Sequence, residues 1–321
     1  MRCIGKLLLA VCMLMVAAAH APSRADDDAL SFIVPYAAGG TADTLARKLA
    51  EVVRQQTGLI LVIENQGGAG GTIGAAQVAR SKPDGRTVML ASTSALTIGP
   101  NLGRGDYDPI RDFTPLLSAG IGPVAILATK SARFKDLEGA LEYARAHPGA
   151  IRYGTPGVGS VAHLAMEGLQ MQADVALTHV PYRGESPAIQ DGLGGVVELL
   201  VVNTPTVLQH AKAGTLRPLA VLEPERLGAW PDVPTLQEAG YEDLNYNSNF
   251  GVFTAAGLSK NDYERVSTLM GNAVESADFQ DLLRSLSLLP GSARGQAYAR
   301  QIADEHARNA GIIKARRITA Q

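Results

Sequence analysis

The stretch VPYAAGGTADTLA, residues 34–46, joins a short apolar segment to two glycines, a hydroxyl residue and an amphipathic run. Residues 30–34 are mostly apolar, as expected of a buried strand, and residues 41–54 carry leucine and valine at helical spacing. The pattern therefore predicts a strand that leads into a helix through Gly39 and Gly40. With Thr41 at the N-cap, backbone N–H groups of the first helical turn would be open to an anion.

Strand and helix patterns alternate along the chain that follows this stretch. Strands are predicted at 59–64 and 87–91, with a helix at 72–80 between them. This order is typical of a parallel sheet covered by helices.

A second alternating unit follows a less regular segment. Residues 92–130 contain two short strand patterns, at 116–119 and 124–128, and the alternation then restarts and continues over 135–222. A further strand and two helical regions lie within 250–315. A chain that leaves one α/β unit, builds a second and returns with helices predicts two lobes joined by crossing segments.

The second unit contains a helix start that resembles the first. Gly159 and Ser160 follow a strand pattern and open a helix, as Gly40 and Thr41 do. Either start alone would be ordinary helix capping. Two starts at corresponding places favour a cleft for a small acid, because helix N-termini attract anions without lysine or arginine. Since Asp43 already occupies the first turn of the earlier helix, the main anion contact is predicted at Ser160.

Residues 1–25 have the features of a secretory signal peptide. Arg2 and Lys6 precede an apolar run at 7–19, which is short for a membrane span, and small residues around Ala25 suit cleavage. Lipidation of Cys12 is the alternative, but the valine before it is a poor residue for that modification. The mature protein is expected to be exported and periplasmic.

Charge and composition argue against several classes of function. Removing residues 1–25 takes away three basic and no acidic residues, so the formal charge changes from −2 to −5, with 26 basic against 31 acidic residues. A mildly acidic chain does not suggest nucleic-acid binding. Both cysteines, Cys3 and Cys12, lie in the removed segment, and the histidines show no metal-ligand spacing, so neither a cofactor nor a metal is expected.

From residue 30 to residue 313 the sequence resembles the periplasmic solute-binding proteins of the tripartite tricarboxylate transporter type, the Bug family. The resemblance rests on VPYAAGGTADTLARKLAE, VIENQGGAGGTIGA, PDGRTVMLASTSALTIGPNL, YGTPGVGSVAHLAMEGL, HVPYRGESPAIQDGLGG, KAGTLRPLAV and WPDVPTLQEAGY. It implies an α/β fold of two Rossmann-like lobes, similar to type II periplasmic binding proteins, with a ligand cleft between them. It also implies a monomeric receptor, not an enzyme, that binds a small organic carboxylate and delivers it to a membrane permease or a signalling partner.

The resemblance also implies lobe boundaries and ligand contacts. Lobe 1 is expected to comprise residues 26–125 and 249–321, and lobe 2 residues 126–248. The first lobe would contribute Tyr36, Gly40, Thr41, Asp43, Ala69, Gly70, Ser92, Thr93 and Ser94, and the second Thr155, Gly159, Ser160, His163, Arg183 and Asn203. Val202 stands where many members have an acid, which removes a partner for an amino group. We therefore expect a non-amino organic acid as the ligand.

Two other functions compete with this interpretation. The segment from Gly157 to Ala162 matches the dinucleotide pattern G-x-G-x-x-A. A dinucleotide-binding fold also requires an acid at the end of the next strand, and this sequence has none there. A secreted hydrolase with Ser160 as nucleophile and His163 or His179 as base is the stronger alternative. Its Gly-Ser context, however, is not the G-x-S-x-G of a nucleophile elbow.

Overall fold

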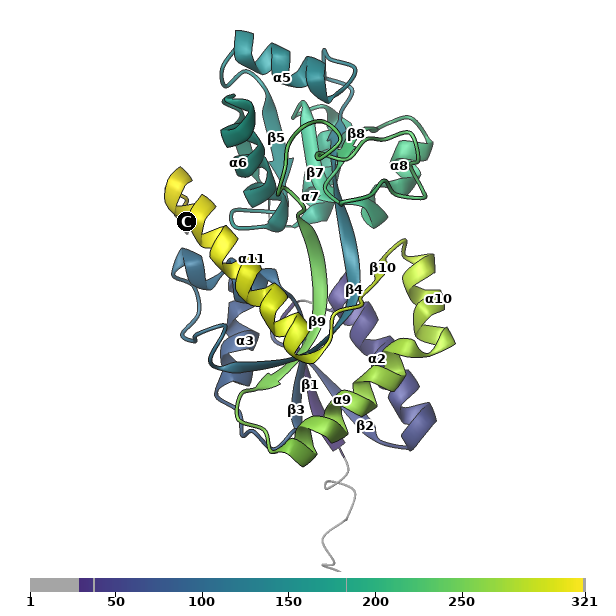
Figure 1. The fold of residues 1–321 in the computed structure, drawn as a ribbon. Helices are drawn as coiled ribbons and strands as arrows, with labels where there is room; N and C mark the ends of the chain where they lie inside the picture. Colours follow the sequence, from purple (N-terminus) through teal and green to yellow (C-terminus); the bar gives the residue numbers. More distant parts are fainter. Residues whose placement is uncertain (1–28, 37, 183, 320–321) are drawn as a thin grey trace, which may run out of the picture.

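The computed structural model describes residues 29–36, 38–182 and 184–319. The predicted signal peptide and Arg183 lie outside these residues. Figure 1 shows two lobes, one above the other, with strands and one long helix extending between them. The structure therefore has the two-lobed α/β architecture that the sequence predicts.

The first lobe is built on a mixed sheet. Its strands are β2 (Ile60–Asn65), β1 (Ala29–Val34), β3 (Thr87–Ser92), β9 (Asn247–Ala255) and β4 (Phe113–Ala128), in that spatial order. β1 pairs in parallel with β2 and β3, as the alternating pattern predicts, whereas β9 is antiparallel to both β3 and β4. The short β10 (Leu289–Pro290) pairs with β4. The C-terminal part of the chain thus completes the sheet that the N-terminal part begins.

Helices cover both faces of this sheet. α2 (Thr41–Thr57), α9 (Lys260–Glu275) and α10 (Ala277–Ser285) pack with Phe32, while α3 (Thr72–Ala79), α4 (Ser94–Thr97) and the start of α11 (Gly295–Arg316) lie on the side of Ile33. Phe32 and Ile33 are both fully buried. Because successive strand residues point to opposite faces, Phe32 packs in the core on one side of the sheet and Ile33 in the core on the other side.

The second lobe repeats the arrangement on a smaller sheet. β5 (Arg152–Thr155) pairs in parallel with β6 (Thr178–Pro181) and β7 (Leu199–Asn203), and both β7 and β8 (Arg217–Val221) are antiparallel to the C-terminal half of β4. α5 (Leu137–Ala146) and α6 (Val161–Ala173) cover one face, and α7 (Glu185–Gly194) covers the other. The remaining short helices are η2 (Ala69–Gly71), η3 (Pro100–Leu102), η4 (Thr204–Thr206) and α8 (Leu208–Lys212).

β4 corrects the prediction of two short strands at 116–119 and 124–128. It is one strand of 16 residues that pairs with β9 along its first part and with β7 from Val124 onward. The stretch from Gly120 to Pro123, which resembles a break in the sequence, pairs with β9 in continuous register, and the two register shifts against β9 lie before it. The continuous pairing comes from strands far away in the chain, which a local pattern does not reveal. β4 consequently belongs to both lobes.

Within the described residues, three segments cross between the lobes: β4, the chain that enters β9, and α11. In α11, Tyr298 and Ile302 are buried in the first lobe, whereas Ile313 packs in the second with residues of α6. The helix therefore lies against both lobes, as Figure 1 shows.

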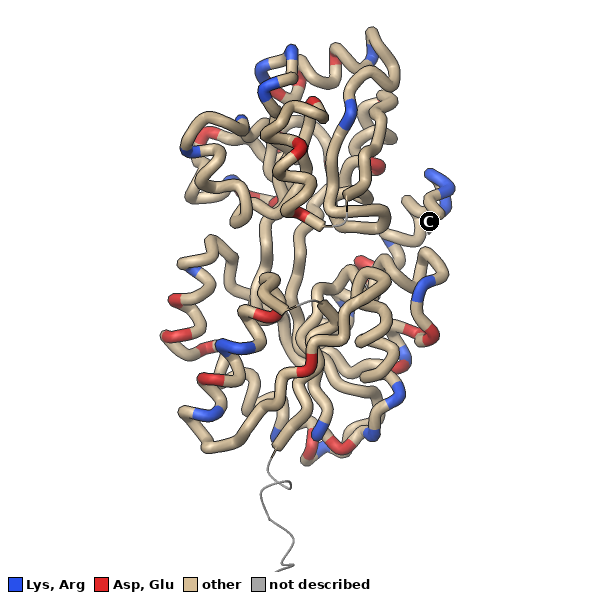
Figure 2. Tube along the Cα trace, turned by 180° about the vertical axis from the view of Figure 1, so that it is seen from behind, with Lys and Arg blue, Asp and Glu red and all other residues tan. Residues whose placement is uncertain are grey.

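Basic and acidic residues are interspersed over both lobes in the view of Figure 2. In the part of the chain that the structure describes, no helix has the length and apolar character needed to cross a bilayer.

Candidate functional site

A cavity of about 360 Å³ lies between the two lobes. The first lobe supplies Tyr36, Gly40, Thr41, Ala42, Ser92 and Ser94, the crossing strands supply Val124, Ser248 and Phe250, and the second lobe supplies Pro156, Ser160, Val161, Ala162, Gly184, Glu185, Val202 and Asn203. Its volume is within the range of small-molecule sites, and most of its surface is apolar. A ligand in this cavity would contact both lobes at once.

Among the described helices, α2 at Thr41, α6 at Val161 and α7 at Glu185 begin at the cavity wall, as does the four-residue α4 at Ser94. At the start of α6, Ser160 is the N-cap, as predicted, and its hydroxyl accepts a hydrogen bond from the His163 N–H at 3.2 Å. The N–H groups of Val161 and Ala162 belong to the first turn, where a helix has no internal acceptors for them. With the partial positive charge of the helix terminus, they form a site suited to a carboxylate.

The start of α2 differs from the prediction. Gly40, not Thr41, is the N-cap, and Thr41 is the first helical residue. The reason lies in Asp43, whose carboxylate reaches back to the N–H of Gly39 at 2.8 Å and fixes the chain ahead of the helix. Thr41 still lines the cavity, so its hydroxyl remains available as a ligand contact.

Small hydroxyl groups line the first-lobe side of the cavity. Ser94 Oγ donates to Ser92 Oγ at 3.1 Å, and burial raises the pKa of the Tyr36 hydroxyl to about 12, so Tyr36 remains neutral. On the opposite side, Ser248 Oγ donates to Asn203 Oδ1 at 2.9 Å. These groups can both donate and accept hydrogen bonds, which suits recognition of oxygen-rich ligands.

Glu185 is a lining residue that the sequence analysis did not select. It is the first residue of α7, and its Oε1 accepts a hydrogen bond from the backbone N–H of Asn203 at 2.8 Å. Burial raises the pKa of this carboxyl group to about 7, although the bonds from Asn203 act in the opposite direction. An acid in the first turn of a helix is common because it is favoured by the positive end of the helix dipole, so nothing in the sequence pattern indicates that this one faces a cavity.

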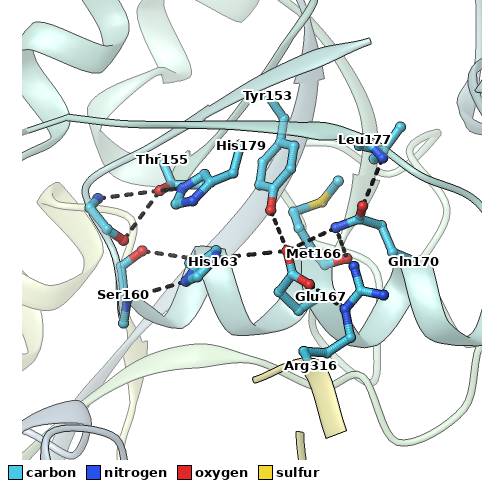
Figure 3. A network of polar contacts seen from close by, with 12 residues as sticks. Tyr153, Thr155, Ser160, His163, Met166, Glu167, Gln170, Leu177, His179 and Arg316 are labelled. Carbon is cyan, nitrogen blue, oxygen red and sulfur yellow. Dashed lines mark hydrogen bonds and ion pairs between the residues drawn. The ribbon is translucent and has the colours of Figure 1, made fainter. Parts of the chain in front are cut away.

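His163 is directed away from the cavity and into the second lobe (Figure 3). Its Nδ1 accepts from the Gly159 N–H at 3.2 Å, its Nε2 lies 3.7 Å from Glu167 Oε1, and its ring stacks on His179 at 4.0 Å. Burial lowers the pKa of both histidines, that of His179 to about 3, so both are neutral at neutral pH. His163 therefore supports the start of α6 from behind.

This network leaves Ser160 without a catalytic base among the described residues. His163 Nδ1 is occupied by Gly159, and His179 Nε2 lies 2.7 Å from Thr155 Oγ1. A serine hydrolase needs an imidazole nitrogen hydrogen-bonded to the nucleophile. Among the described residues, no cluster of three or more His, Cys, Asp or Glu side chains could hold a metal ion.

Several other predicted contacts lie beside the cavity instead of lining it. Asp43 is buried and accepts from Arg47 and Asn65 as well as from Gly39. Thr93 donates to Glu305 of α11 at 2.9 Å. The other predicted residues outside the lining are Ala69, Gly70, Thr155 and Gly159, while Arg183 lies outside the described residues. Whether these residues reach a ligand stays a prediction.

Two α/β lobes with a helix-lined cavity between them define the class of two-lobed solute-binding receptors. The family model described as the tripartite tricarboxylate transporter family receptor, TctC, matches residues 45–318. The chain belongs to this family, whose members are periplasmic solute-binding proteins. The resemblance inferred from the motifs is thereby confirmed, and the hydrolase alternative finds no support.

Relatives and solved structures are similar over nearly the whole chain. Protein BugT of Bordetella pertussis is 32% identical over 314 residues, which is 96% of each chain. A Rhodopseudomonas palustris protein solved with adipate is 30% identical with a TM-score of 0.79, and the match covers 90% of this chain and 97% of that one. MatC of the same organism, solved with malate, is 28% identical with a TM-score of 0.77 over 89% and 98%.

Proposed function

We propose that this chain captures a small organic carboxylate in the cavity between its lobes and delivers it to a membrane permease or a signalling partner. The observation that supports this most is the start of α6, where Ser160 and two first-turn N–H groups line the cavity. Adipate and malate bound to related proteins are further support for an acid.

Export and movement of the lobes are part of the same proposal. Residues 1–25 act as a cleaved signal, and the mature receptor works in the periplasm as a monomer. Residues 26–125 and 249–321 form one moving body and residues 126–248 the other. A ligand that contacts both bodies favours the state in which they are closed.

The Ser160→Ala variant tests the anion contact. The Ser160 hydroxyl accepts from His163 N–H and can donate its own proton to a ligand carboxylate. Because a charge-assisted hydrogen bond contributes about 1.5–3 kcal/mol, the variant should bind an acid roughly ten- to a hundredfold more weakly. A panel of mono-, di- and tricarboxylates is screened by thermal shift, and the dissociation constants are measured by calorimetry.

Loss of the helix cap needs its own control. Ser259 caps α9 in the same way, through the N–H of Asp262, and lies outside the cavity lining. Ser259→Ala should lower thermal stability without changing affinity. Equal affinities of the Ser160→Ala variant and the wild type would contradict the anion contact, and hydrolysis of an ester that is lost in Ser160→Ala would contradict the receptor function.

A further inference from the structure

Glu185 differs from every other described residue that lines the cavity, because it alone has a side chain that carries a charge near neutral pH. The rest of the lining consists of apolar side chains, glycines, hydroxyl groups and one amide. The first-turn N–H groups at the start of α6 can bind an anion, whereas Asp43 occupies the first turn of α2. Glu185 introduces a group of the opposite preference into the same small space.

The contact with Asn203 uses only part of this carboxylate. Oε1 accepts the Asn203 N–H, and among the described residues the hydrogen bonds of Glu185 are made with Asn203. A glutamine would keep that bond, since its amide oxygen is also an acceptor. The local structure of α7 and β7 therefore requires an acceptor at this position but does not require a charge.

Closure of the lobes makes the ionised form of Glu185 costly unless a cation accompanies it or the carboxyl group takes up a proton. A buried carboxylate without a cationic partner is unfavourable, and a hydroxyl donor would leave the charge in place. A protonated amine supplies both a donor and the opposite charge. The length of the ligand then decides whether its carboxylate can reach the start of α6 while its amine reaches Glu185.

We propose that Glu185 receives a protonated amine, so that the preferred ligand is a carboxylic acid that also carries an ammonium group. This proposal rests on the proposed function and narrows its ligand class. It corrects the expectation of a non-amino acid, which rests on Val202, because Glu185 supplies the cavity with a carboxylate that Val202 does not.

Matched ligands of equal length test the proposal directly. The first series is adipate, 6-aminohexanoate and 6-hydroxyhexanoate, and the second is succinate, 4-aminobutanoate and 4-hydroxybutanoate, all measured by calorimetry at about pH 8.5, where Glu185 is ionised. In at least one series the wild type should bind the amino compound about tenfold or more tightly than the dicarboxylate. Glu185→Gln should remove or reverse that preference.

Glu223→Gln is the matched control. Glu223 is also buried, its pKa is also raised to about 7 by burial, and it bonds to Asn247 away from the cavity lining. This variant should keep the preference of the wild type. Arg183→Gln is added because Arg183 is close to Glu185 in the chain. If the Arg183→Gln variant prefers the amino compound and the wild type does not, Glu185 is already paired with Arg183 in the wild type. That result would overturn the proposal.

A pH series gives a second test that needs no variant of Glu185. Its protonation as pH falls from about 8.5 to about 6 should weaken binding of the amino compound relative to the dicarboxylate. The other titratable group in the described lining, Tyr36, stays neutral over this range. Equal binding of all three compounds at every pH, or tighter binding of the hydroxy compound, would overturn the proposal and leave the receptor function intact. If no acid of any kind binds, the proposed function fails as well.

Discussion

Gly251 and Gly311 lie in very different surroundings, although both are glycines inside regular elements. A Cβ on Gly251 in β9 would overlap the Tyr298 hydroxyl and lie 2.8 Å from Phe253 Cζ. At Gly311 in α11, no atom lies within 4 Å of the same position apart from the adjacent residues and the backbone of the helix itself. The first glycine is required by packing, whereas the second only makes its helix less stable.

The two Gly→Ala variants should therefore change stability in opposite directions. Gly251→Ala should lower the free energy of unfolding by about 1–3 kcal/mol, because a core without space must shift. Gly311→Ala should raise it by about 0.5–1 kcal/mol through better helix propensity. Urea unfolding followed by circular dichroism measures both. A gain of stability in both variants would show that backbone entropy, and not packing, decides the outcome at Gly251.

Residues near the site differ in how far the sequence could predict them. Ser160 was predicted as an N-cap because capping depends on a few neighbouring residues. The orientation of His163 was not, because Glu167 and His179 hold it from inside the second lobe. The place of Glu185 in the cavity depends on how α7 meets β7, and only the tertiary structure shows it.

At the scale of elements, α11 and α6 are joined by an ion pair between Arg316 and Glu167 (Figure 3). Tyr153 donates to the same carboxylate at 2.8 Å. Burial would raise the pKa of Glu167, but the hydrogen bonds from Arg316 and Tyr153 hold it below the usual value of 4.5. The pair fastens the end of a helix that begins in the first lobe to the second lobe.

Arg316→Ala should destabilise the protein by about 1–2 kcal/mol at neutral pH, because it leaves a mostly buried carboxylate without its cation. Since the folded state lowers the pKa of Glu167, the stability that the pair contributes is present above about pH 4.5 and is lost as pH falls below it. The difference between variant and wild type should therefore shrink in acid. Unfolding by urea at neutral and acidic pH measures it.

Arg284→Ala provides the comparison for an exposed pair. Arg284 contacts Asp281 on the surface of α10, where both side chains are mostly in solvent. Such pairs contribute little because water and salt screen them. A loss in Arg284→Ala as large as that in Arg316→Ala would show that the contact between α11 and α6 has no special role.

The elements show the same division between local and distant information. The strands and helices of each α/β unit follow from short-range periodicity, as β1 and α2 illustrate. β4 was predicted as two strands because its pairing with β9 and β7 joins residues far apart in the chain. The same distant pairing makes β4 a crossing segment, so the connection between the lobes was the part of the fold that the sequence described least well.

At the scale of the whole molecule, the part of the chain that the structure describes has three segments that cross between the lobes. β4 is a strand in the sheets of both lobes, the chain entering β9 pairs with it, and α11 lies against both lobes. If the lobes close by turning about the strands, either α11 bends or its contact with α6 shifts. A ligand should therefore select among inter-lobe distances while each lobe keeps its own shape.

Spin labels attached to introduced cysteines can measure the distance between the lobes. A chain beginning at residue 26 has no native cysteine to be labelled, because Cys3 and Cys12, the chain's two cysteines, lie within residues 1–25. A label pair at Gln55→Cys on α2 and Glu138→Cys on α5 reports the distance between the lobes. A second pair, at Gln55→Cys and Gln77→Cys on α3, reports a distance within the first lobe. All three positions are exposed. A saturating concentration of the acid with the largest thermal shift should narrow and shift the inter-lobe distribution, because a ligand that contacts both lobes favours one closed arrangement. The distribution within the first lobe should stay unchanged. Identical inter-lobe distributions with and without the acid would mean that the ligand enters a preformed cavity and that the lobes do not move as the two proposed bodies.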